Sequence, residues 1–328
     1  MKSFRLVNPT TLDEAIAISS DKAAGQTKFL AGGQDLLTEM KEHLASPDRV
    51  VNLKSISGLD ALDSSSGALK IGALVTLARI ERDATVRAHW TALSEAAASV
   101  ASPQIRSCGT IGGNLCQRPR CWYYRLEEAK CLKKGGTECF SYGGLNKYNA
   151  ILGGGPVYIV HPSDLAPALI ALGAEIVLRS KSGERRMPLE KFYVLPADGD
   201  VTKETVLQDG EIVTEIVVPK AAAGSRSTYV KFKERESYDF ALSAVAASVV
   251  IEGGVVKSAR ICLGAVAPVP WRVERAEKLL VGRALDETAA RAAAEAALHG
   301  AEPLSQNGYK VPLTKTLVER ALAALGKT

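Results

Sequence analysis

Two glycine pairs, the first between an expected strand and helix and the second flanked by polar side chains, constrain this chain more than any other feature. The first lies in Ala31-Gly32-Gly33-Gln34-Asp35-Leu36 and the second in Thr110-Ile111-Gly112-Gly113-Asn114. Glycine lets backbone N–H groups approach a ligand closely, and a pyrophosphate can sit at the start of a helix. One Gly-Gly turn is more often structural, but two such loops can clasp a dinucleotide from both sides. Neither is the Gly-x-Gly-x-x-Gly of a nicotinamide-binding Rossmann unit, so that mode of NAD binding is not indicated.

The order of strand and helix signals indicates an α+β fold. A capping box at Thr11-Leu12-Asp13-Glu14 begins the first helix, because its threonine and glutamate side chains can satisfy free backbone donors. Pro219 and the small residues from Ala221 to Gly224 predict a domain boundary, since they cannot continue a strand. Beyond it we expect a hairpin at Gly253-Gly254 and two alanine-rich helices. The expected units are two subdomains, about 1–55 and 56–220, and a C-terminal α+β domain at 225–328.

Composition excludes several classes of protein. The net charge of +5 is spread over 41 basic and 36 acidic residues without a long run of one sign, so no nucleic-acid-binding stripe stands out. No apolar run approaches the roughly 20 residues of a membrane span, and the N-terminus has no apolar signal region. We therefore expect a soluble, cytoplasmic protein that binds neither nucleic acid nor membrane.

Four sequence segments in register resemble a known family. Lys28 to Leu37 and Thr110 to Asn114 are similar to the two flavin-loop signatures of the FAD subunit of molybdenum hydroxylases, the xanthine dehydrogenase family. His161 to Leu169 resembles the next landmark of that family, and Tyr229 to Phe240 resembles the entry to its C-terminal domain. The resemblance implies an FAD-binding domain of the vanillyl-alcohol-oxidase/PCMH type, followed by a domain of the CO dehydrogenase flavoprotein type.

The resemblance also implies roles for individual residues. One group would hold the pyrophosphate and adenosine half of FAD: Leu30, Ala31, Gly32, Gly33, Gln34, Asp35 and Leu36. A second group would complete the clasp on the ribityl and phosphate side: Thr110, Gly113, Asn114 and Asp164. Ile212 and Val213 match a position that packs on the flavin, and Lys231 matches a lysine beside its pyrimidine edge. From the residues alone, a solvated strand lysine is the preferred interpretation of Lys231, and Asp164 fits a helix cap, alone or together with the FAD role.

Four of the six cysteines fall in one segment, spaced Cys116-x4-Cys121-x9-Cys131-x7-Cys139. Four thiolates suit a tetrahedral zinc or an iron–sulfur cluster, and cysteines that bind nothing are the alternative. The absence of a Cys-x-x-Cys pair argues against a zinc ribbon. Cys262, outside the segment, is expected to be a small buried side chain.

The segment at about 117–156 resembles the insertion that carries a 4Fe-4S cluster in the FAD subunits of 4-hydroxybenzoyl-CoA reductase and certain bacterial aldehyde oxidoreductases. Cys121, Cys131 and Cys139 match three of its ligands. Val157 stands where those relatives have the fourth cysteine, and valine has no donor atom. Either Cys116 or a non-cysteine ligand completes the site, or the cluster is labile or absent.

The function implied by the resemblance is electron transfer within a complex. A large partner subunit with a molybdopterin cofactor would oxidise the substrate, and a small subunit with 2Fe-2S clusters would pass electrons to FAD on this chain. The complex would be a heterotrimer or a dimer of heterotrimers. Two alternatives are a stand-alone FAD oxidoreductase of the same fold and a non-enzymatic interaction protein with a four-cysteine metal site. The substrate pocket would belong to the partner, so the sequence does not identify the organic substrate or the final electron acceptor.

Overall fold

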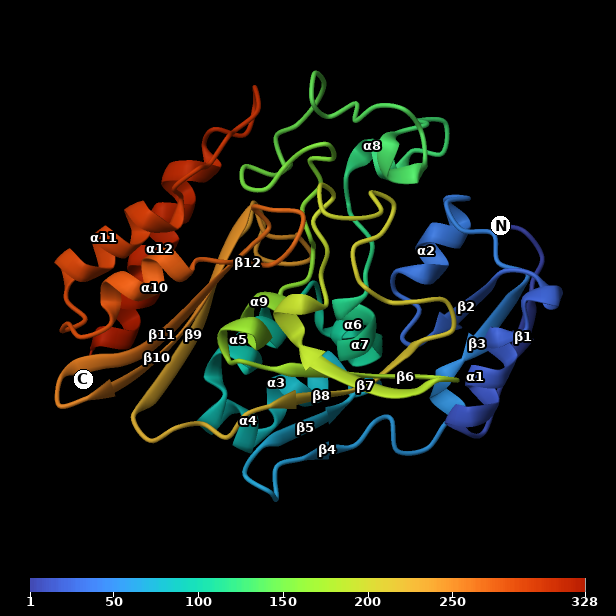
Figure 1. The fold of residues 1–328 in the computed structure, drawn as a ribbon, viewed down its shortest axis with the longest axis horizontal. Helices are drawn as coiled ribbons and strands as arrows, with labels where there is room; N and C mark the ends of the chain where they lie inside the picture. Colours follow the sequence, from blue (N-terminus) through green and yellow to red (C-terminus); the bar gives the residue numbers. More distant parts are fainter. Residues whose placement is uncertain (328) are drawn as a thin grey trace.

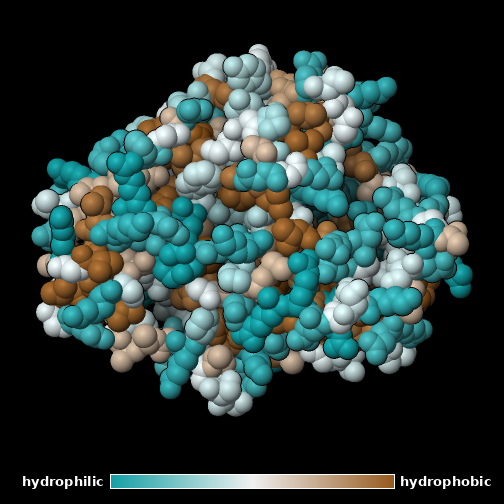
Figure 2. Space-filling view, viewed as in Figure 1, coloured by the Kyte–Doolittle hydropathy of each residue, from teal (hydrophilic) through white to brown (hydrophobic). Residues whose placement is uncertain are grey.

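The computed structural model describes residues 1–327, which form three β-sheets with helices packed around them. Figure 1 shows the N-terminal three-stranded sheet at one end, the five-stranded sheet in the middle and the C-terminal four-stranded sheet at the other end. The α+β fold is therefore confirmed. Figure 2 shows polar side chains over most of the same face, with smaller apolar areas between them. Within residues 1–327, none of the helices combines the length and the apolar character needed to cross a membrane.

The N-terminal subdomain is a parallel sheet with strand order β1-β3-β2. Parallel neighbours need crossover connections, which the helices supply. The Thr11 side chain accepts a hydrogen bond from the backbone N–H of Glu14 (3.2 Å), as the capping box predicts. The elements are β1 (Arg5–Val7), α1 (Leu12–Ser20), η1 (Lys22–Ala24), β2 (Thr27–Leu30), α2 (Leu36–Lys41), β3 (Arg49–Asn52) and η2 (Leu53–Ser55).

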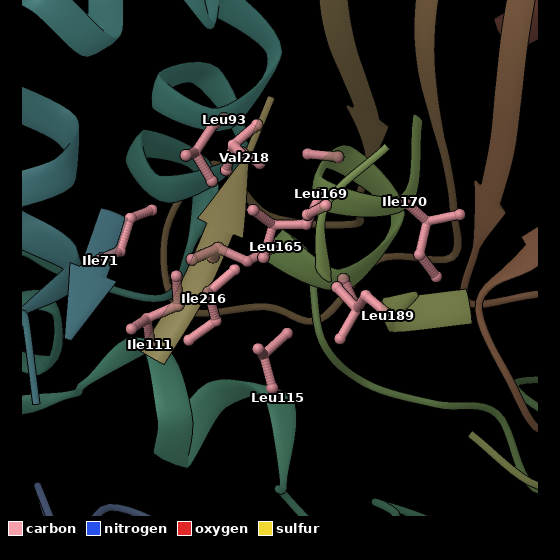
Figure 3. Packing of buried hydrophobic residues seen from close by; sticks show 14 of the residues in the cluster. Ile71, Leu93, Ile111, Leu115, Leu165, Leu169, Ile170, Leu189, Ile216 and Val218 are labelled. Atoms are coloured by element: carbon pink, nitrogen blue, oxygen red, sulfur yellow. The ribbon is translucent and has the colours of Figure 1, made fainter. Parts of the chain in front are cut away.

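The second subdomain is built on the sheet β4-β5-β8-β6-β7. Figure 3 shows how side chains of the sheet and its helices gather in one core, among them Ile71, Ile216, Leu93 and Leu165. The strands are β4 (Leu62–Asp63), β5 (Leu69–Gly72), β6 (Glu175–Ser180), β7 (Gly183–Pro188) and β8 (Ile212–Val218). The helices are α3 (Leu77–Arg82), α4 (Ala84–His89), α5 (Thr91–Ser99), α6 (Pro103–Cys108), α7 (Ile111–Leu115), α9 (Leu165–Ala171) and η4 (Leu189–Lys191).

The C-terminal sheet has the order β12-β11-β10-β9 and is buried on both faces. Side chains of a strand alternate between its two faces. Along β10, Ala244 and Ala246 join the core of the second subdomain, whereas Val245 and Val249 pack with the C-terminal helices. The elements are β9 (Ser225–Phe232), β10 (Ser243–Glu252), β11 (Val255–Gly264), β12 (Trp271–Arg272), α10 (Glu274–Leu280), α11 (Glu287–Ala297) and α12 (Lys310–Gly326). The hairpin turn lies at Gly253 and Gly254, as predicted, and both have positive φ.

The segment at about 117–156 leaves the second subdomain and crosses to the other two parts. It contains α8 (Trp122–Arg125) and η3 (Leu132–Lys134) and is otherwise irregular. Figure 1 shows it, in green, between the N-terminal subdomain and the C-terminal helices. We call this segment the insertion. It contacts all three parts of the fold around the cavity described next.

Candidate functional site

A cavity of about 530 Å³ lies where the N-terminal subdomain, the second subdomain and the insertion meet. A second cavity of about 420 Å³ continues from it past Arg120, Asp164 and Phe240, which line both. Volumes of this size are typical of cofactor sites. Most of the residues that the sequence assigns to FAD line the first cavity: Ala31, Gly32, Gly33, Gln34, Asp35, Leu36, Thr110, Gly113, Asn114, Asp164 and Lys231.

The first glycine loop connects β2 to α2 and requires glycine for two different reasons. Gly33 has φ of +75°, a left-handed conformation that side-chain-bearing residues rarely adopt. At Gly32, an added Cβ would lie 2.2 Å from the backbone oxygen of Cys108 and 3.1 Å from Cα of Gly109. Gly32 therefore lets the first loop touch the segment that leads into the second loop, and this contact forms one wall of the cavity.

The second glycine loop opens α7 and presents its backbone to the cavity. Thr110 begins the helix by accepting a hydrogen bond from the backbone N–H of Gly113 (3.2 Å). Gly112 packs against the backbone oxygen of Ala73, which an added Cβ would approach to 2.9 Å. At Gly113, an added Cβ would meet, within 4 Å among the described residues, only Oγ1 of Thr110. Gly113 thus leaves open space beside its backbone, as a loop that receives a ligand requires.

Asn114 links the second loop to the His161-Pro162-Ser163-Asp164 segment. The Ser163 hydroxyl donates to Oδ1 of Asn114 (2.6 Å) and accepts from the backbone N–H of Ala166 (3.0 Å). Ser163 therefore makes the side-chain bond at the start of α9, and, among the described residues, Asp164 makes no such cap. The carboxylate of Asp164 is instead directed toward β9.

A buried ion pair joins Asp164 to Lys231 of β9. Nζ of Lys231 lies 2.8 Å from Oδ2 of Asp164 and donates to the backbone oxygen of Ser99 (3.1 Å). The Tyr229 hydroxyl donates to Oδ1 of Asp164 (2.6 Å), and burial raises the pKa of Tyr229 well above its usual value. The Lys231 side chain is only 3% exposed, so the solvated-lysine interpretation is wrong. Both members of the pair line the cavity.

Three of the sequence-assigned residues lie outside the lining of the cavity. Leu30 is the last residue of β2, and its side chain lies beside Gly33, where an added Cβ would approach it to 3.3 Å. Ile212 and Val213 of β8 are buried in apolar cores of the N-terminal and second subdomains. The expectation that Ile212 and Val213 pack on the flavin is therefore not met in the lining of this cavity, because both side chains fill apolar cores instead.

The insertion contributes residues that the sequence did not single out. Three groups of the insertion hold the Asp35 carboxylate of the first loop: the backbone N–H of Arg118 (2.6 Å), Nη1 of Arg120 (2.7 Å) and Nη2 of Arg125 (2.8 Å). All three arginines line the cavity, as do Tyr238 and Phe240. Arg118 and Arg120 stand between Cys116 and Cys121 in the sequence, so the signal for them was their place inside the cysteine-rich segment.

The structure does not bring the four cysteines together as a metal site. In residues 1–327, no group of three or more His, Cys, Asp or Glu side chains is arranged to hold a metal. Cys116 packs against the core of the second subdomain, and this enclosure raises the pKa of its thiol to about 12. The Cys139 sulfur lies 3.1 Å from the Ser141 hydroxyl, and the Asn149 amide lies 3.9 Å from the Cys121 sulfur. These residues do not fit a four-thiolate cluster that includes Cys116.

Comparisons with known proteins agree with this geometry. The family described as "FAD binding domain in molybdopterin dehydrogenase" matches residues 2–221, and "CO dehydrogenase flavoprotein C-terminal domain" matches residues 227–325. The FAD-binding subunit of an aldehyde oxidoreductase of Escherichia coli (strain K12) is 34% identical, with 98% of each chain covered. The medium chain of carbon monoxide dehydrogenase of Hydrogenophaga pseudoflava is 30% identical, with 98% of this chain and 96% of that one covered.

Solved structures give the same result. A structure of the Hydrogenophaga pseudoflava carbon monoxide dehydrogenase aligns with a TM-score of 0.78 at 29% identity, covering 98% of this chain and 96% of that one. Quinoline 2-oxidoreductase from Pseudomonas putida 86 aligns with a TM-score of 0.77 at 27% identity, covering 99% and 98%.

Proposed function

Since this chain belongs to the family of FAD-binding subunits of molybdopterin dehydrogenases, we propose that it carries electrons from 2Fe-2S clusters of a partner subunit, through FAD, to an acceptor. It is an oxidoreductase subunit that binds FAD. Two relatives that match along nearly their whole length are the FAD-binding subunit of an aldehyde oxidoreductase and the medium chain of a carbon monoxide dehydrogenase. A four-cysteine interaction protein would not be expected to match dehydrogenase subunits over 98% of its length.

The observation that carries the proposal is the lining of the cavity. Two glycine loops present backbone at one end, and the buried Lys231–Asp164 pair lies in the same lining. Open space beside Gly113 and the left-handed backbone at Gly33 suit a cofactor that approaches the main chain closely. These features fit FAD. We assign the two loops to its phosphate-bearing part and Lys231 to its flavin ring.

FAD supplies two-electron chemistry that can also proceed one electron at a time, which suits a position between one-electron clusters and an acceptor. The chain's own residues bind the cofactor, orient it and set the charge around it. Lys231 provides a fixed ammonium where reduction places negative charge, and such a charge favours the reduced form. Asp164 and Ser99 hold that ammonium in place by direct hydrogen bonds, and the Tyr229 hydroxyl holds Asp164 in turn. In this account no residue of the chain acts on the organic substrate.

The partners that we propose are a large molybdopterin-binding subunit and a small 2Fe-2S subunit, in a heterotrimer or a dimer of heterotrimers. The medium-chain relatives support this assignment. A stand-alone FAD oxidoreductase is less well supported, because the C-terminal domain at 227–325 matches the CO dehydrogenase flavoprotein type. Since Cys116 does not join the other cysteines, no electron-transfer step is assigned to the insertion.

The test is removal and return of the flavin in the assembled complex. The complex without FAD should still reduce its 2Fe-2S clusters when the organic substrate is added, but it should not reduce the final acceptor. Adding FAD should restore turnover with the acceptor. Unchanged reduction of the acceptor by the flavin-free complex would refute the proposed electron path.

A further inference from the structure

We propose that the insertion is a wall of the FAD site, that Arg120 and Arg125 supply the positive charge that the cavity needs to accept FAD, and that Arg118, whose guanidinium is paired with Glu204, holds Asp35 through its backbone N–H. This inference rests on the proposed function and adds residues to the same site. It gives the insertion a role that does not depend on its cysteines. The role follows from the fact that most of the basic side chains in the cavity lining belong to the insertion.

The charges that line the cavity balance only when the insertion is counted. Among the described residues, five acidic and five basic side chains line it. Three of the five basic residues belong to the insertion. Without them, the remaining lining would carry a net negative charge and would repel a diphosphate. The acidic residues are Asp35, Glu39, Glu42, Asp164 and Asp239, and the basic ones are Lys28, Arg118, Arg120, Arg125 and Lys231.

The arginines neutralise the carboxylates nearest the first glycine loop. Arg120 and Arg125 both bind Oδ1 of Asp35, whose side chain is 17% exposed. Arg125 also lies 3.4 Å from a carboxylate oxygen of Glu42 in the segment that ends α2. Because Asp35 is largely enclosed, removal of either arginine would leave its negative charge less fully compensated beside the first glycine loop.

The three guanidinium groups are held in position before any ligand binds. Arg118 and Arg125 lie over the ring of Tyr124, at 5.1 and 5.4 Å from its centroid, and Arg120 lies 5.0 Å from the centroid of Phe240. The Tyr124 hydroxyl in turn donates to Oε1 of Glu39 (2.6 Å). Fixed cations of this kind lose little freedom when an anion arrives.

The far end of the insertion is anchored to the C-terminal domain. Buried Asn307 donates to the backbone oxygens of Asn149 and Ala150, both at 3.1 Å. Buried Lys310 donates to the backbone oxygens of Tyr148 and Ala265, both at 2.8 Å. The insertion is therefore fixed at both ends, and its arginines face the cavity as part of the folded protein.

The test is a charge cycle on FAD affinity. The full chain, freed of flavin, is titrated with FAD and the dissociation constant is measured for the wild type, Arg125→Gln, Asp35→Asn and the double variant. Arg125→Gln should weaken binding about ten-fold or more, because it leaves the lining of the cavity with one positive charge fewer than negative charges. The double variant should bind FAD more tightly than Arg125→Gln alone, because it restores the charge balance. Arg291→Gln, at an exposed i,i+4 pair on α11, is the matched control and should bind like the wild type.

The outcomes separate this inference from the proposed function. A wild-type chain that does not bind FAD would refute both. A wild type that binds FAD, with Arg125→Gln binding equally well, would refute only the role of the insertion. A double variant that binds FAD no more tightly than Arg125→Gln would refute the charge-balance argument, because Arg125 would then act only by supporting the structure of the site. If Arg125→Gln does not fold, Arg120→Gln with Asp35→Asn gives the same cycle, and Arg125→Lys should keep most of the affinity.

Discussion

Replacing Gly32 with alanine should force apart the two loops that enclose the cavity. The new Cβ would lie 2.2 Å from the backbone oxygen of Cys108 and 3.1 Å from Cα of Gly109. Both obstacles are backbone, so no side chain can rotate away. Ordinary contact requires about 1 Å more separation, so one loop must move by roughly that amount.

The energetic cost can be placed on a scale. Overpacking of this kind typically costs about 1–3 kcal/mol. We expect the free energy of unfolding of flavin-free Gly32→Ala to fall by about 2 kcal/mol, and its FAD affinity to fall as well, because the displaced loop carries Gly33 and Asp35. Gly113→Ala should behave differently. Its Cβ would meet only Oγ1 of Thr110 within 4 Å among the described residues, at 3.1 Å, so the protein should lose FAD affinity with little loss of stability.

The assay is denaturant unfolding of the flavin-free proteins, together with FAD titration of each. Gly32→Ala should lower the free energy of unfolding more than Gly113→Ala does, whereas both variants should bind FAD more weakly than the wild type. Wild-type stability and wild-type FAD affinity in Gly32→Ala would show that the two loops do not touch as described.

Three further predictions follow from buried groups. Lys231→Met should lower the flavin reduction potential and Asp164→Asn should raise it, each by about 30 mV or more in a redox titration, and shifts of the same sign would contradict the ion-pair account. Burial lowers the pKa of Lys310 to about 7, so the unfolded state holds the extra proton between about pH 7 and 10.5 and stability should rise with pH there. Lys310→Met should remove this contribution to the pH dependence of the free energy of unfolding, measured with denaturant. An unchanged pH dependence would refute the role of Lys310. Cys116→Ser should leave the iron content of anaerobically purified protein unchanged, and a loss of iron would show that Cys116 is a ligand. Val157→Cys tests separately whether a cysteine at position 157 allows the protein to bind iron.

Local signals in the sequence were sufficient for many of the elements. The Thr11 capping box and the Gly253-Gly254 hairpin each depend on neighbours a few residues apart, and the structure confirms both. Such features are determined by backbone chemistry within one segment, so a single sequence can show them.

The contacts that shape the site were not visible in this way. Asp35 meets Arg118 and Arg125 across 83 and 90 positions of sequence, and no local pattern announces such pairing. Lys231 is held by Asp164 and Ser99, which lie 67 and 132 positions away, and Tyr229 of the same strand bonds Asp164. Close spacing of cysteines suggested a shared metal, but Cys116 ends a short helix that faces a core.

Flavin content decides whether FAD lies between the two glycine loops, because a side chain at Gly113 would occupy the space beside the second loop. The full-length chain is purified as wild type, Gly113→Val and Gly308→Val, and FAD per chain is measured after the proteins are shown to be folded. Gly308 is the control, because an added Cβ there meets nothing within 4 Å of the described residues and the position does not line the cavity. We expect one FAD per chain in the wild type and in Gly308→Val, and almost none in Gly113→Val. Full FAD occupancy in folded Gly113→Val would contradict this expectation.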